Sequence, residues 1–420
     1  MRKVPRYKYI QTAKCVFKNI LRKEAIYPFY ASFKTTRKCN FTCSFCNCWH
    51  VKNKWKDLST EDMKRIIDNI ASSSVIVCSF EGGDPLVRDD IHELLKYQWE
   101  KPFYLLFTTS ERDLADRYPM EEYSKYIDFL HISIDEGHEN LDMFDELDTY
   151  TKWGSVVTVQ LVVTTDTVDE LEWKIKRCYE AGTKAVVMIA VHLESTRDHF
   201  PDVKKLSETG LRLKEKYPGV IISPDGYFKR MLAPHGCDTS SLIIDADGML
   251  WYPCRVLEGK TINLAKDPLM PFLESDDAHR KRVAMSKCEI ACGWYQYYAT
   301  SSFVNPLEFF GAWSPYFRDL VDGGKQSYYT ARPEQTGKWM HGPTEGTLAT
   351  NGGNGGARKV GGPGLLGCRG CGSMNHGGDG SACHRTRVAD LEKRGLPVKG
   401  PRFGPPVLSE KNEQVIPLMA

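Results

Sequence analysis

The stretch RKCNFTCSFCNCWH, residues 37–50, places four cysteines within ten positions: Cys39, Cys43, Cys46 and Cys48. The first three have the spacing C-x3-C-x2-C, and three thiolates on one short loop can converge on one inorganic cluster, because iron–sulfur clusters are held by cysteine thiolates. A zinc site normally takes four ligands from two separated pairs, and a redox C-x-x-C does not need the third thiol. Three ligands for a four-iron cluster leave one iron free to bind another molecule. Cys48 would be an awkward fourth ligand, and we interpret it as a bystander or a supporting group.

The composition restricts the class of protein. The chain has 420 residues, a formal net charge of +2 and 41% hydrophobic residues, enough for a sizeable core. This charge balance gives no reason to expect a nucleic-acid partner. No uncharged apolar run reaches the ~18 residues of a membrane-spanning helix, and the N-terminus lacks the apolar core and cleavage site of a secretory signal. Clustered cysteines among the 14 in such a chain indicate metal binding or redox chemistry in a reducing cytoplasm.

From residue 29 onward, short apolar runs alternate with helical patterns. The run SVIVCSF is nearly continuous in apolar residues, as expected for a strand covered on both faces, and STEDMKRIIDNIA opens with a capping-box pattern. Strands that alternate with helices at this spacing imply parallel βαβ units. We therefore predict an α/β fold, a partial (β/α)6 TIM-like barrel with one side open for a large substrate. Its strands are expected at about residues 29–35, 75–80, 103–108, 129–134, 155–164 and 185–191, and its helices near 59–71, 89–99, 113–126, 139–149, 167–181 and 202–217.

Residues 7–24 predict a basic amphipathic helix before the barrel. Its apolar positions repeat at helical spacing, and lysines and arginines surround them. Such a helix lies either on an anionic membrane surface or against the domain beside it, and the sequence leaves both interpretations open. The apolar positions are Ile10, Ala13, Val16, Phe17, Ile20 and Leu21, and the basic ones are Lys8, Lys14, Lys18, Arg22 and Lys23.

Beyond residue 300 the composition changes twice. Residues 301–330 are rich in aromatic side chains, which form either a membrane-facing belt or a strap across the core. Residues 331–420 are glycine-rich, poor in apolar residues and without periodicity, so we expect a disordered tail; a reading-frame accident upstream of it is an alternative hypothesis. The tail residues Cys368, Cys371, His376 and Cys383 are spaced somewhat like a zinc knuckle, but glycine-rich sequence yields such sets by chance.

The cysteine loop resembles the signature of the radical S-adenosylmethionine (SAM) enzymes, including the aromatic Phe45 just before the last ligand. The resemblance covers roughly residues 29–225 as the core domain. It implies that Cys39, Cys43 and Cys46 hold a [4Fe–4S] cluster whose open iron chelates the amino and carboxylate groups of SAM. In that family an electron from the cluster cleaves the sulfonium to methionine and a 5′-deoxyadenosyl radical. The resemblance also implies reduced ferredoxin or flavodoxin as the electron donor.

Motifs at later strand ends agree with this resemblance. EGGDP, residues 81–85, is similar to the family's G-G-E-P motif with aspartate in place of glutamate, and its glycines would let backbone groups approach the SAM ammonium. FTTS, residues 107–110, occupies the site of the third-strand motif but lacks the usual asparagine-glycine. HISID, residues 131–135, resembles the fourth-strand motif near the SAM ribose, and the last two strands would supply polar and adenine contacts. The resemblance assigns to SAM the residues Phe45, Gly82, Gly83, Asp84, Pro85, Thr109, Ser133, Asp135, Thr164 and Ile189.

A second set of cysteines follows the core. SLIIDADGMLWYPC, residues 241–254, predicts a hairpin with its turn at Asp247-Gly248, which brings Cys237 and Cys254 towards each other. Four thiolates can close a [4Fe–4S] cluster, and the alternative is a zinc site with the same four ligands. The stretch resembles the Twitch or SPASM extension of many radical SAM enzymes. That resemblance implies one auxiliary [4Fe–4S] cluster on Cys237, Cys254, Cys288 and Cys292.

The sequence thus predicts a radical SAM oxidoreductase or transferase that takes a hydrogen atom from an unactivated carbon, and no residue is assigned a catalytic role. A membrane-associated lipid substrate is favoured by the basic helix and the aromatic segment, and a peptide or protein substrate by the auxiliary domain. A protein of another class, an iron–sulfur electron carrier or metal-dependent scaffold, would not need the strand-end motifs. We expect a cytoplasmic protein, peripheral on the inner membrane face if the lipid interpretation holds. Its predicted parts are the basic helix (1–28), the radical SAM core (29–225), the auxiliary cluster domain (226–300), the aromatic-rich segment (301–330) and the tail (331–420).

Overall fold

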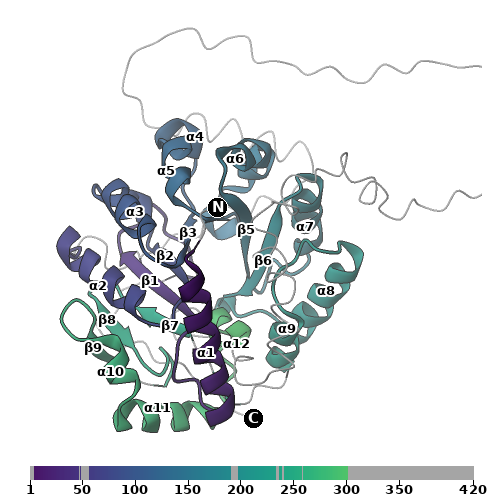
Figure 1. Cartoon of the computed structure of the whole chain (residues 1–420). Helices are drawn as coiled ribbons and strands as arrows, with labels where there is room; N and C mark the ends of the chain where they lie inside the picture. The colour runs from purple at the N-terminus through teal and green to yellow at the C-terminus, as the bar shows by residue number, and fades with distance from the viewer. Residues whose placement is uncertain are drawn as a thin grey trace, which may run out of the picture. The chain divides into compact units, whose positions relative to one another are not determined.

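A nine-stranded sheet runs through the part of the chain that the computed structural model describes (Figure 1). Strands β1 to β6 lie parallel in the order β6-β5-β4-β3-β2-β1, and each of the six predicted strands is present. This arrangement confirms the α/β class with a partial TIM-like barrel. The strands are β1 (Tyr30–Thr36), β2 (Val77–Gly82), β3 (Tyr104–Thr109), β4 (Phe129–Ser133), β5 (Val156–Val163) and β6 (Lys184–Ile189).

The structure describes residues 4–46, 48, 56–190, 197–232, 236–238, 241–257 and 259–300, all of which belong to one compact unit. The aromatic-rich segment 301–330 and the glycine-rich tail 331–420 lie outside these ranges, and so do the candidate zinc ligands Cys368, Cys371, His376 and Cys383.

Helices flank the strands on the outside of the barrel (Figure 1). The predicted capping residue Ser59 begins α2, since its hydroxyl accepts a hydrogen bond from the Asp62 N–H at 3.1 Å. The single helix predicted over 113–126 is instead two short helices, because Pro119 cannot continue a helix and restricts the residue before it. The helices are α1 (Arg6–Arg22), α2 (Thr60–Ser72), α3 (Ile91–Trp99), α4 (Leu114–Arg117), α5 (Met120–Tyr123), α6 (Leu147–Tyr150), α7 (Leu171–Glu180), α8 (Val203–Lys216), α9 (Asp225–Leu232), α10 (Leu269–Leu273), α11 (Asp276–Ser286) and α12 (Tyr295–Thr300).

The helix predicted over 139–149 is wrong in its first half, which forms 3-10 turns over Leu141–Glu146. The cause is tertiary. The side-chain amide of Asn140 donates to the backbone carbonyls of Ser110 (3.2 Å) and Ser133 (2.8 Å). These bonds tie the start of the segment to the ends of β3 and β4 and compete with helical pairing.

The two faces of the sheet differ in chemistry. Phe33, Phe80 and Phe107 lie side by side on β1, β2 and β3 and are fully buried in the main apolar core. Alternate residues of each strand point to the opposite face, where Lys34 of β1 lies beside Glu81 of β2. The helices therefore cover an apolar face, while the face towards the inside of the barrel carries polar side chains.

A hairpin extends the sheet beyond β1. Strand β7 (Ser241–Ile244) lies parallel to β1, and β8 (Met249–Trp251) and β9 (Lys260–Asn263) follow antiparallel. The turn predicted at Asp247-Gly248 is confirmed, because Gly248 has a φ of +81°, which glycine adopts without steric cost. The region that carries the second set of cysteines therefore shares one sheet with the barrel.

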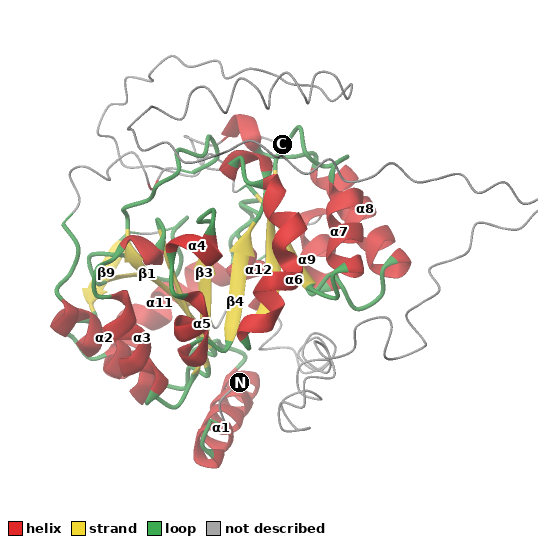
Figure 2. Cartoon of the chain, turned by 90° about the horizontal axis from the view of Figure 1, so that it is seen from above, coloured by secondary structure: helices red, strands yellow, loops and turns green. Residues whose placement is uncertain are grey.

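Helix α1 lies at the end of the barrel where the strands begin, apart from the helices that flank the sheet (Figure 2). Its Lys8 Nζ donates to the carbonyl of Ala71 at 3.1 Å, and its Thr12 hydroxyl to the carbonyl of Ser74 at 3.1 Å, both just before β2. Val16 packs in a small apolar cluster around the starts of β1, β2 and β3. Across the described ranges, no helix combines the length and the apolar character that crossing a bilayer requires.

Candidate active site at the strand ends

The cysteine loop follows β1 and lies at the carboxyl end of the barrel strands. Cys43 is buried, Cys39 and Cys46 are half-buried, and none of the three forms a disulfide with another described cysteine. The backbone N–H of Phe41 points at the Cys39 sulfur and that of Cys48 at the Cys46 sulfur, each at 3.5 Å. Ligands of parallel α/β proteins bind at this end of the sheet, so the loop stands where a bound group is expected.

The end of β2 holds the base of the loop through backbone contacts. The N–H of Gly83 donates to the Thr36 carbonyl at 2.8 Å, and the N–H of Asp84 to the Lys38 carbonyl at 2.9 Å. A Cβ atom on Gly82, whose φ is +150°, would lie 2.2 Å from the Thr36 oxygen, and one on Gly83 only 1.9 Å from the Lys38 oxygen. The paired glycines are therefore required for close approach to the cysteine loop, a role that the sequence did not reveal.

Asp84 joins the ends of β2 and β3. Its carboxylate is fully buried and accepts hydrogen bonds from the Leu86 N–H (3.0 Å), the Thr109 hydroxyl (2.8 Å) and the Ser110 N–H (2.8 Å). Burial raises the pKa of Asp84 to about 6, against the effect of these donors. The next residue, Pro85, is buried at the start of a short 3-10 turn. Asp84 and Thr109, both predicted SAM contacts, thus meet each other directly.

The end of β4 reaches the cysteine loop through His138. Its Nδ1 lies 2.8 Å from Asp135 Oδ1, and its ring meets the edges of Phe41 and Phe45 at centroid distances of 5.4 and 5.7 Å. Burial alone would lower the pKa of His138, but Asp135 and the neighbouring Cys43 thiol raise it to about 10. Sequence reasoning missed His138, and the signal it offered was weak: a histidine three residues after a predicted site aspartate.

Asp135 carries an unused acceptor. Its side chain is fully buried, and its second oxygen, Oδ2, finds no hydrogen-bond partner among the residues that the structure describes. A buried carboxylate oxygen without a partner is costly, so a bound hydroxyl or N–H donor would stabilise it. Ser133, two residues earlier, is buried at the end of the same strand. This oxygen fits the ribose contact that the resemblance assigns to Asp135.

The last two predicted SAM residues are engaged elsewhere. Thr164 binds Thr167, with the Thr164 N–H donating to the Thr167 hydroxyl at 2.8 Å. Ile189 packs against Gly293, where a Cβ atom would lie 2.0 Å from the Ile189 Cδ1. The end of β6 therefore meets the turn that follows Cys292 and adjoins the second set of cysteines.

Charged residues to which the sequence assigned no role hold the loop from two further sides. Glu111, fully buried after β3, accepts a hydrogen bond from the side chain of Asn40. Arg37 forms two hydrogen bonds with the buried Asp245 at the end of β7, one of them 3.2 Å from Nε to Oδ1. Lys260 lies 2.8 Å from the same carboxylate. Glu111 and Asp245 are 71 and 208 residues away from their partners in the loop, so no local sequence pattern predicts these contacts.

Cys48 is a buried neighbour of the Cys46 sulfur. Besides the backbone bond, the two side chains are in hydrogen-bond contact. That contact and the cations of Lys34, Arg255 and Arg37 hold the pKa of Cys48 below its usual value, although burial opposes them. The residue therefore lies against the cysteine loop, beside Cys46.

The four cysteines of the second set, Cys237, Cys254, Cys288 and Cys292, also lie close together. The Cys237 N–H donates to the Met285 carbonyl at 3.1 Å, which holds it beside the turn that carries Cys288 and Cys292. Burial, with the nearby Cys254 and Cys288 thiols, raises the pKa of Cys237 to about 12. Burial and the other three thiols likewise raise the pKa of Cys292. All four sulfurs are therefore within electrostatic reach of one another.

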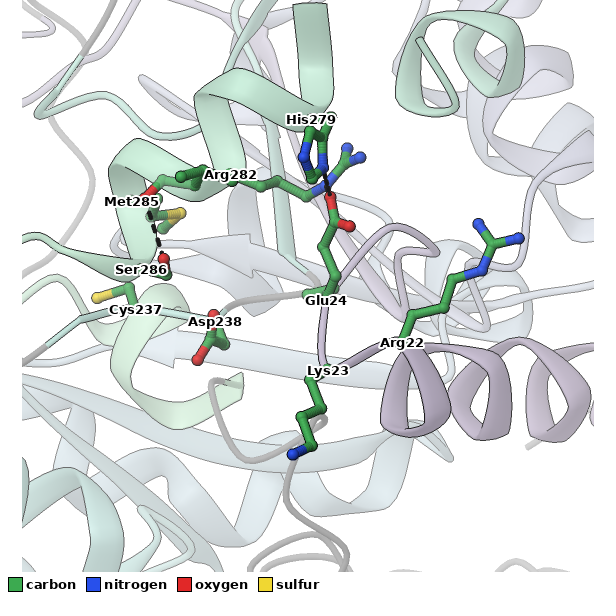
Figure 3. Close-up of a pocket in the computed structure, with 11 residues that line it drawn as sticks. Arg22, Lys23, Glu24, Cys237, Asp238, His279, Arg282, Met285 and Ser286 are labelled. Atoms are coloured by element: carbon green, nitrogen blue, oxygen red, sulfur yellow. Dashed lines mark hydrogen bonds and ion pairs between the residues drawn. The ribbon is translucent and has the colours of Figure 1, made fainter. Parts of the chain in front are cut away.

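The cavity in Figure 3 adjoins this second set. It measures about 180 Å³ and is bounded by Cys237, the end of α1 and helix α11. Glu24, which follows α1, pairs with two residues of α11 across the cavity. Its Oε1 lies 2.9 Å from His279 Nδ1 and 2.5 Å from Arg282 Nε. Burial alone would raise the pKa of Glu24, but these two partners hold it below its usual value. No predicted SAM residue lines the cavity.

The donor chemistry fits clusters at both sets of cysteines. Cys39, Cys46, Cys254 and Cys288 each accept a backbone N–H at 3.4 to 3.5 Å, and such bonds tune cluster potentials. Burial raises the pKa of Cys39 to about 12, so its thiolate needs adjacent positive charge, which bound iron supplies. Within the described ranges no three His, Cys, Asp or Glu side chains are gathered as ligands of a single ion.

Comparison with known proteins identifies the class. Residues 33–206 match the family model described as the Radical SAM superfamily. That segment runs from β1 to α8 and includes the cysteine loop and all the residues predicted to contact SAM. The chain therefore contains a radical SAM superfamily domain, and members of this superfamily are enzymes.

Several named relatives share this domain. Over 311 residues the chain is 21% identical to AdoMet-dependent heme synthase of Nitratidesulfovibrio vulgaris, covering 64% of this chain and 84% of that one. Over 103 residues it is 33% identical to PqqA peptide cyclase of Granulibacter bethesdensis, covering 24% of this chain and 27% of that one. Fe-coproporphyrin III synthase of Methanosarcina barkeri is 32% identical over 114 residues, 26% of this chain and 28% of that one. The chain thus spans about a quarter of the length of the last two relatives.

The fold also has a solved counterpart. SuiB of Streptococcus suis, in a crystal structure with its precursor peptide SuiA, superposes with a TM-score of 0.50 at 17% identity. The match covers 64% of this chain and 69% of that one. At this identity the likeness is one of fold, and it agrees with the partial barrel described above.

Proposed function

We propose that this protein reductively cleaves SAM and uses the resulting 5′-deoxyadenosyl radical to take a hydrogen atom from an unactivated carbon. The observation that carries the proposal is the cysteine loop, held by the ends of β2, β3 and β4 beside the unpartnered oxygen of Asp135. When bound to Cys39, Cys43 and Cys46, a [4Fe–4S] cluster with one open iron supplies the electron that this cleavage needs.

The chain's own residues orient SAM and exclude water. Asp135 Oδ2 accepts a hydrogen bond from a ribose hydroxyl, because it is the acceptor left free beside the loop. Phe41, Phe45 and His138 form an aromatic wall over Cys43 and keep water from the loop. Gly83 and Asp84 fix the loop backbone, and thereby the geometry in which the sulfurs are presented.

We also propose one auxiliary [4Fe–4S] cluster on Cys237, Cys254, Cys288 and Cys292. The mutual proximity of these thiols supports a shared metal site, and we favour a cluster over the zinc alternative because the four thiols accompany a candidate redox core. Such a cluster would accept an electron from the product radical or bind the substrate. Iron and sulfide counting after anaerobic reconstitution should give about eight irons per chain, at four per cluster. A Cys288→Ser variant should fall to about four, and stoichiometric zinc in the wild type would contradict the auxiliary cluster.

For the substrate we favour a peptide or protein over a lipid tail. The inner face of the barrel carries Lys34 and Glu81 on adjacent strands and His131, which is hydrogen-bonded to Gln160. Burying an alkyl chain against such groups is unfavourable. The basic helix that suggested a lipid lies at the opposite end of the strands from the cysteine loop. A rise in 5′-deoxyadenosine formation with a peptide fraction, and none with a lipid extract, would support this choice; the reverse would refute it.

The decisive experiment measures SAM cleavage. The anaerobically reconstituted protein, reduced with dithionite or with ferredoxin or flavodoxin as the proposed donor, should convert SAM to 5′-deoxyadenosine and methionine. Cys43→Ala should abolish the product, and Cys178→Ala, which removes a buried thiol of α7 that belongs to neither set, should not. If the wild type carries intact clusters and yields no 5′-deoxyadenosine with any reductant, the proposal fails and the electron-carrier alternative gains support.

A further inference from the structure

Helix α1 presents its apolar side to solvent. Tyr7, Ile10, Phe17 and Leu21 are 61%, 56%, 60% and 66% exposed. They are four of the seven large apolar side chains that are exposed in the described part of the chain. At ~100° per residue they fall within about 80° of the helix circumference, so they form one continuous stripe, which we call the α1 stripe.

The face of α1 that docks on the barrel is mostly polar and lies opposite the stripe. Its buried residues are Lys8, Thr12, Val16 and Asn19. Lys8 Nζ binds the carbonyls of Ala71 and Ser73 at the end of α2, where a helix leaves carbonyls unpaired and attracts a cation. The Asn19 side chain closes the turn after the helix through Ile26 and Tyr27. Hydrogen bonds and the buried Val16 therefore hold α1 in place, and the stripe has no part in that docking.

The charges around the stripe have one sign. Residues 6–23 contain no aspartate or glutamate, so no acidic side chain of the helix offsets its cations. Lys14 lies within the stripe, Lys18 and Arg22 along one edge and Arg6 along the other, and all four are exposed. An apolar stripe set in a basic field, with aromatic residues among its members, has the chemistry of a helix that lies in an anionic membrane interface.

We propose that α1 docks this protein on an anionic phospholipid surface, with the α1 stripe among the lipid headgroups and the surrounding cations against the lipid phosphates. The helix sits where the strands begin and the cysteine loop where they end, and the seven residues of β1 span ~20 Å at ~3.3 Å each. The candidate active site therefore faces away from the bilayer, so a docked enzyme still takes its substrate from the aqueous side. This inference goes beyond the proposed function and does not depend on either cluster.

Vesicle co-sedimentation of the full chain tests the proposal. The wild type should pellet with vesicles of equal parts phosphatidylglycerol and phosphatidylcholine, and far less with phosphatidylcholine alone. The double variant Phe17→Glu/Leu21→Glu should lower the partition coefficient by about tenfold or more, and removing one cation in Lys14→Gln by about fivefold. Leu232→Glu is the matched control, because Leu232 is 50% exposed on α9; it should pellet like the wild type.

Three results would overturn the proposal: no pelleting with anionic vesicles, equal pelleting with both vesicle types, or a double variant that pellets like the wild type. Sedimentation equilibrium tests the alternative that a second copy of the chain occupies the α1 stripe. A dimer that the double variant abolishes, together with absent vesicle binding, would assign the stripe to a second copy of the chain. Unchanged circular dichroism of the double variant excludes misfolding, since both side chains point away from the barrel.

Discussion

Removing the charge of Asp245 should release the cysteine loop from the β7–β8 hairpin. The Asp245 side chain is fully buried, and its two oxygens accept hydrogen bonds from Arg37, whose side chain is 17% exposed. Lys260 contributes a third contact at 2.8 Å and is 26% exposed. Asp245→Asn keeps the shape of the side chain but leaves two cations facing a neutral amide.

The structure sets the size of the effect. Breaking a buried ion pair by removing one partner costs about 3–5 kcal/mol, because the other charge stays buried and uncompensated. Arg37 and Lys260 both keep some access to water, and Lys260 retains its ion pair with Asp247, so we expect the lower end, a loss of about 3 kcal/mol. The exposed pair Asp169–Lys205, at 77% and 49% side-chain exposure, provides the control. Asp169→Asn should cost about 1 kcal/mol at most.

The sign of the pH dependence follows from the same contacts. Burial alone would raise the pKa of Asp245, but Lys34, Arg37 and Lys260 hold it well below its usual range. The folded state therefore binds fewer protons than the unfolded chain as the pH falls below about 4. The stabilisation is complete above that pH and is lost on acidification, so the comparison belongs at neutral pH.

The assay is urea unfolding of the cluster-free protein under reducing, oxygen-free conditions, followed by far-UV circular dichroism. Iron per chain after reconstitution gives a second reading, since a displaced loop should retain less iron. If Asp245→Asn lowers the free energy of unfolding no more than Asp169→Asn does, the buried ion pair does not hold the loop and the reasoning is refuted.

Three further predictions concern single residues. Gly83→Ala should reduce iron retention, because its Cβ would lie 1.9 Å from the Lys38 oxygen. The control Gly226→Ala should not, because no atom lies within 4 Å of its Cβ. Equal iron contents in the two variants would contradict the steric role of Gly83. Asp135→Asn should weaken SAM binding to the reconstituted protein by about 10- to 100-fold, the worth of one hydrogen bond to a charged group, and unchanged affinity by calorimetry would rule out the ribose contact. Burial lowers the pKa of Lys8 to about 8, so the unfolded chain binds more protons than the folded one between about pH 8 and 10.4, and stability should rise over that interval. Thermal melts of Lys8→Met should lack this rise in stability. A rise that persists in the variant would come from another group.

The sequence was sufficient for the strands of the barrel because their signal is local. Apolar runs such as the one before Glu81 place a strand within two residues of its observed bounds. The prediction of a helix failed where one polar side chain makes tertiary hydrogen bonds. Asn140 binds the ends of β3 and β4, and the segment after it forms 3-10 turns in place of the predicted helix. Of the apolar positions predicted for α1, Ile10, Phe17 and Leu21 are exposed, whereas Val16 is buried in the docking face. Periodicity could not tell which face docks, because the hydrogen bonds of Lys8 and Asn19 hold that face beside Val16.

The candidate site divides in the same way. The three cysteines were recognisable because their spacing is a local constraint of cluster binding. Glu111 and Asp245 could not be found, since each acts through a partner far away in the sequence. His138 offered only its position three residues after Asp135, because its contact with Phe41 exists only in the folded chain. The sequence identified the glycine pair. It could not show why position 83 requires glycine, because the Lys38 backbone comes close to this residue only in the folded chain.

These contacts couple the two sets of cysteines through one carboxylate. Asp245 ends β7, and the same hairpin leads within ten residues to Cys254 of the second set. Its partner Arg37 stands two residues before Cys39 of the first set. Because the hairpin also pairs with β1 in one continuous sheet, a shift of either cysteine set must strain the Arg37–Asp245 bridge or the sheet itself. The two candidate cluster sites therefore share one sheet and one buried ion pair.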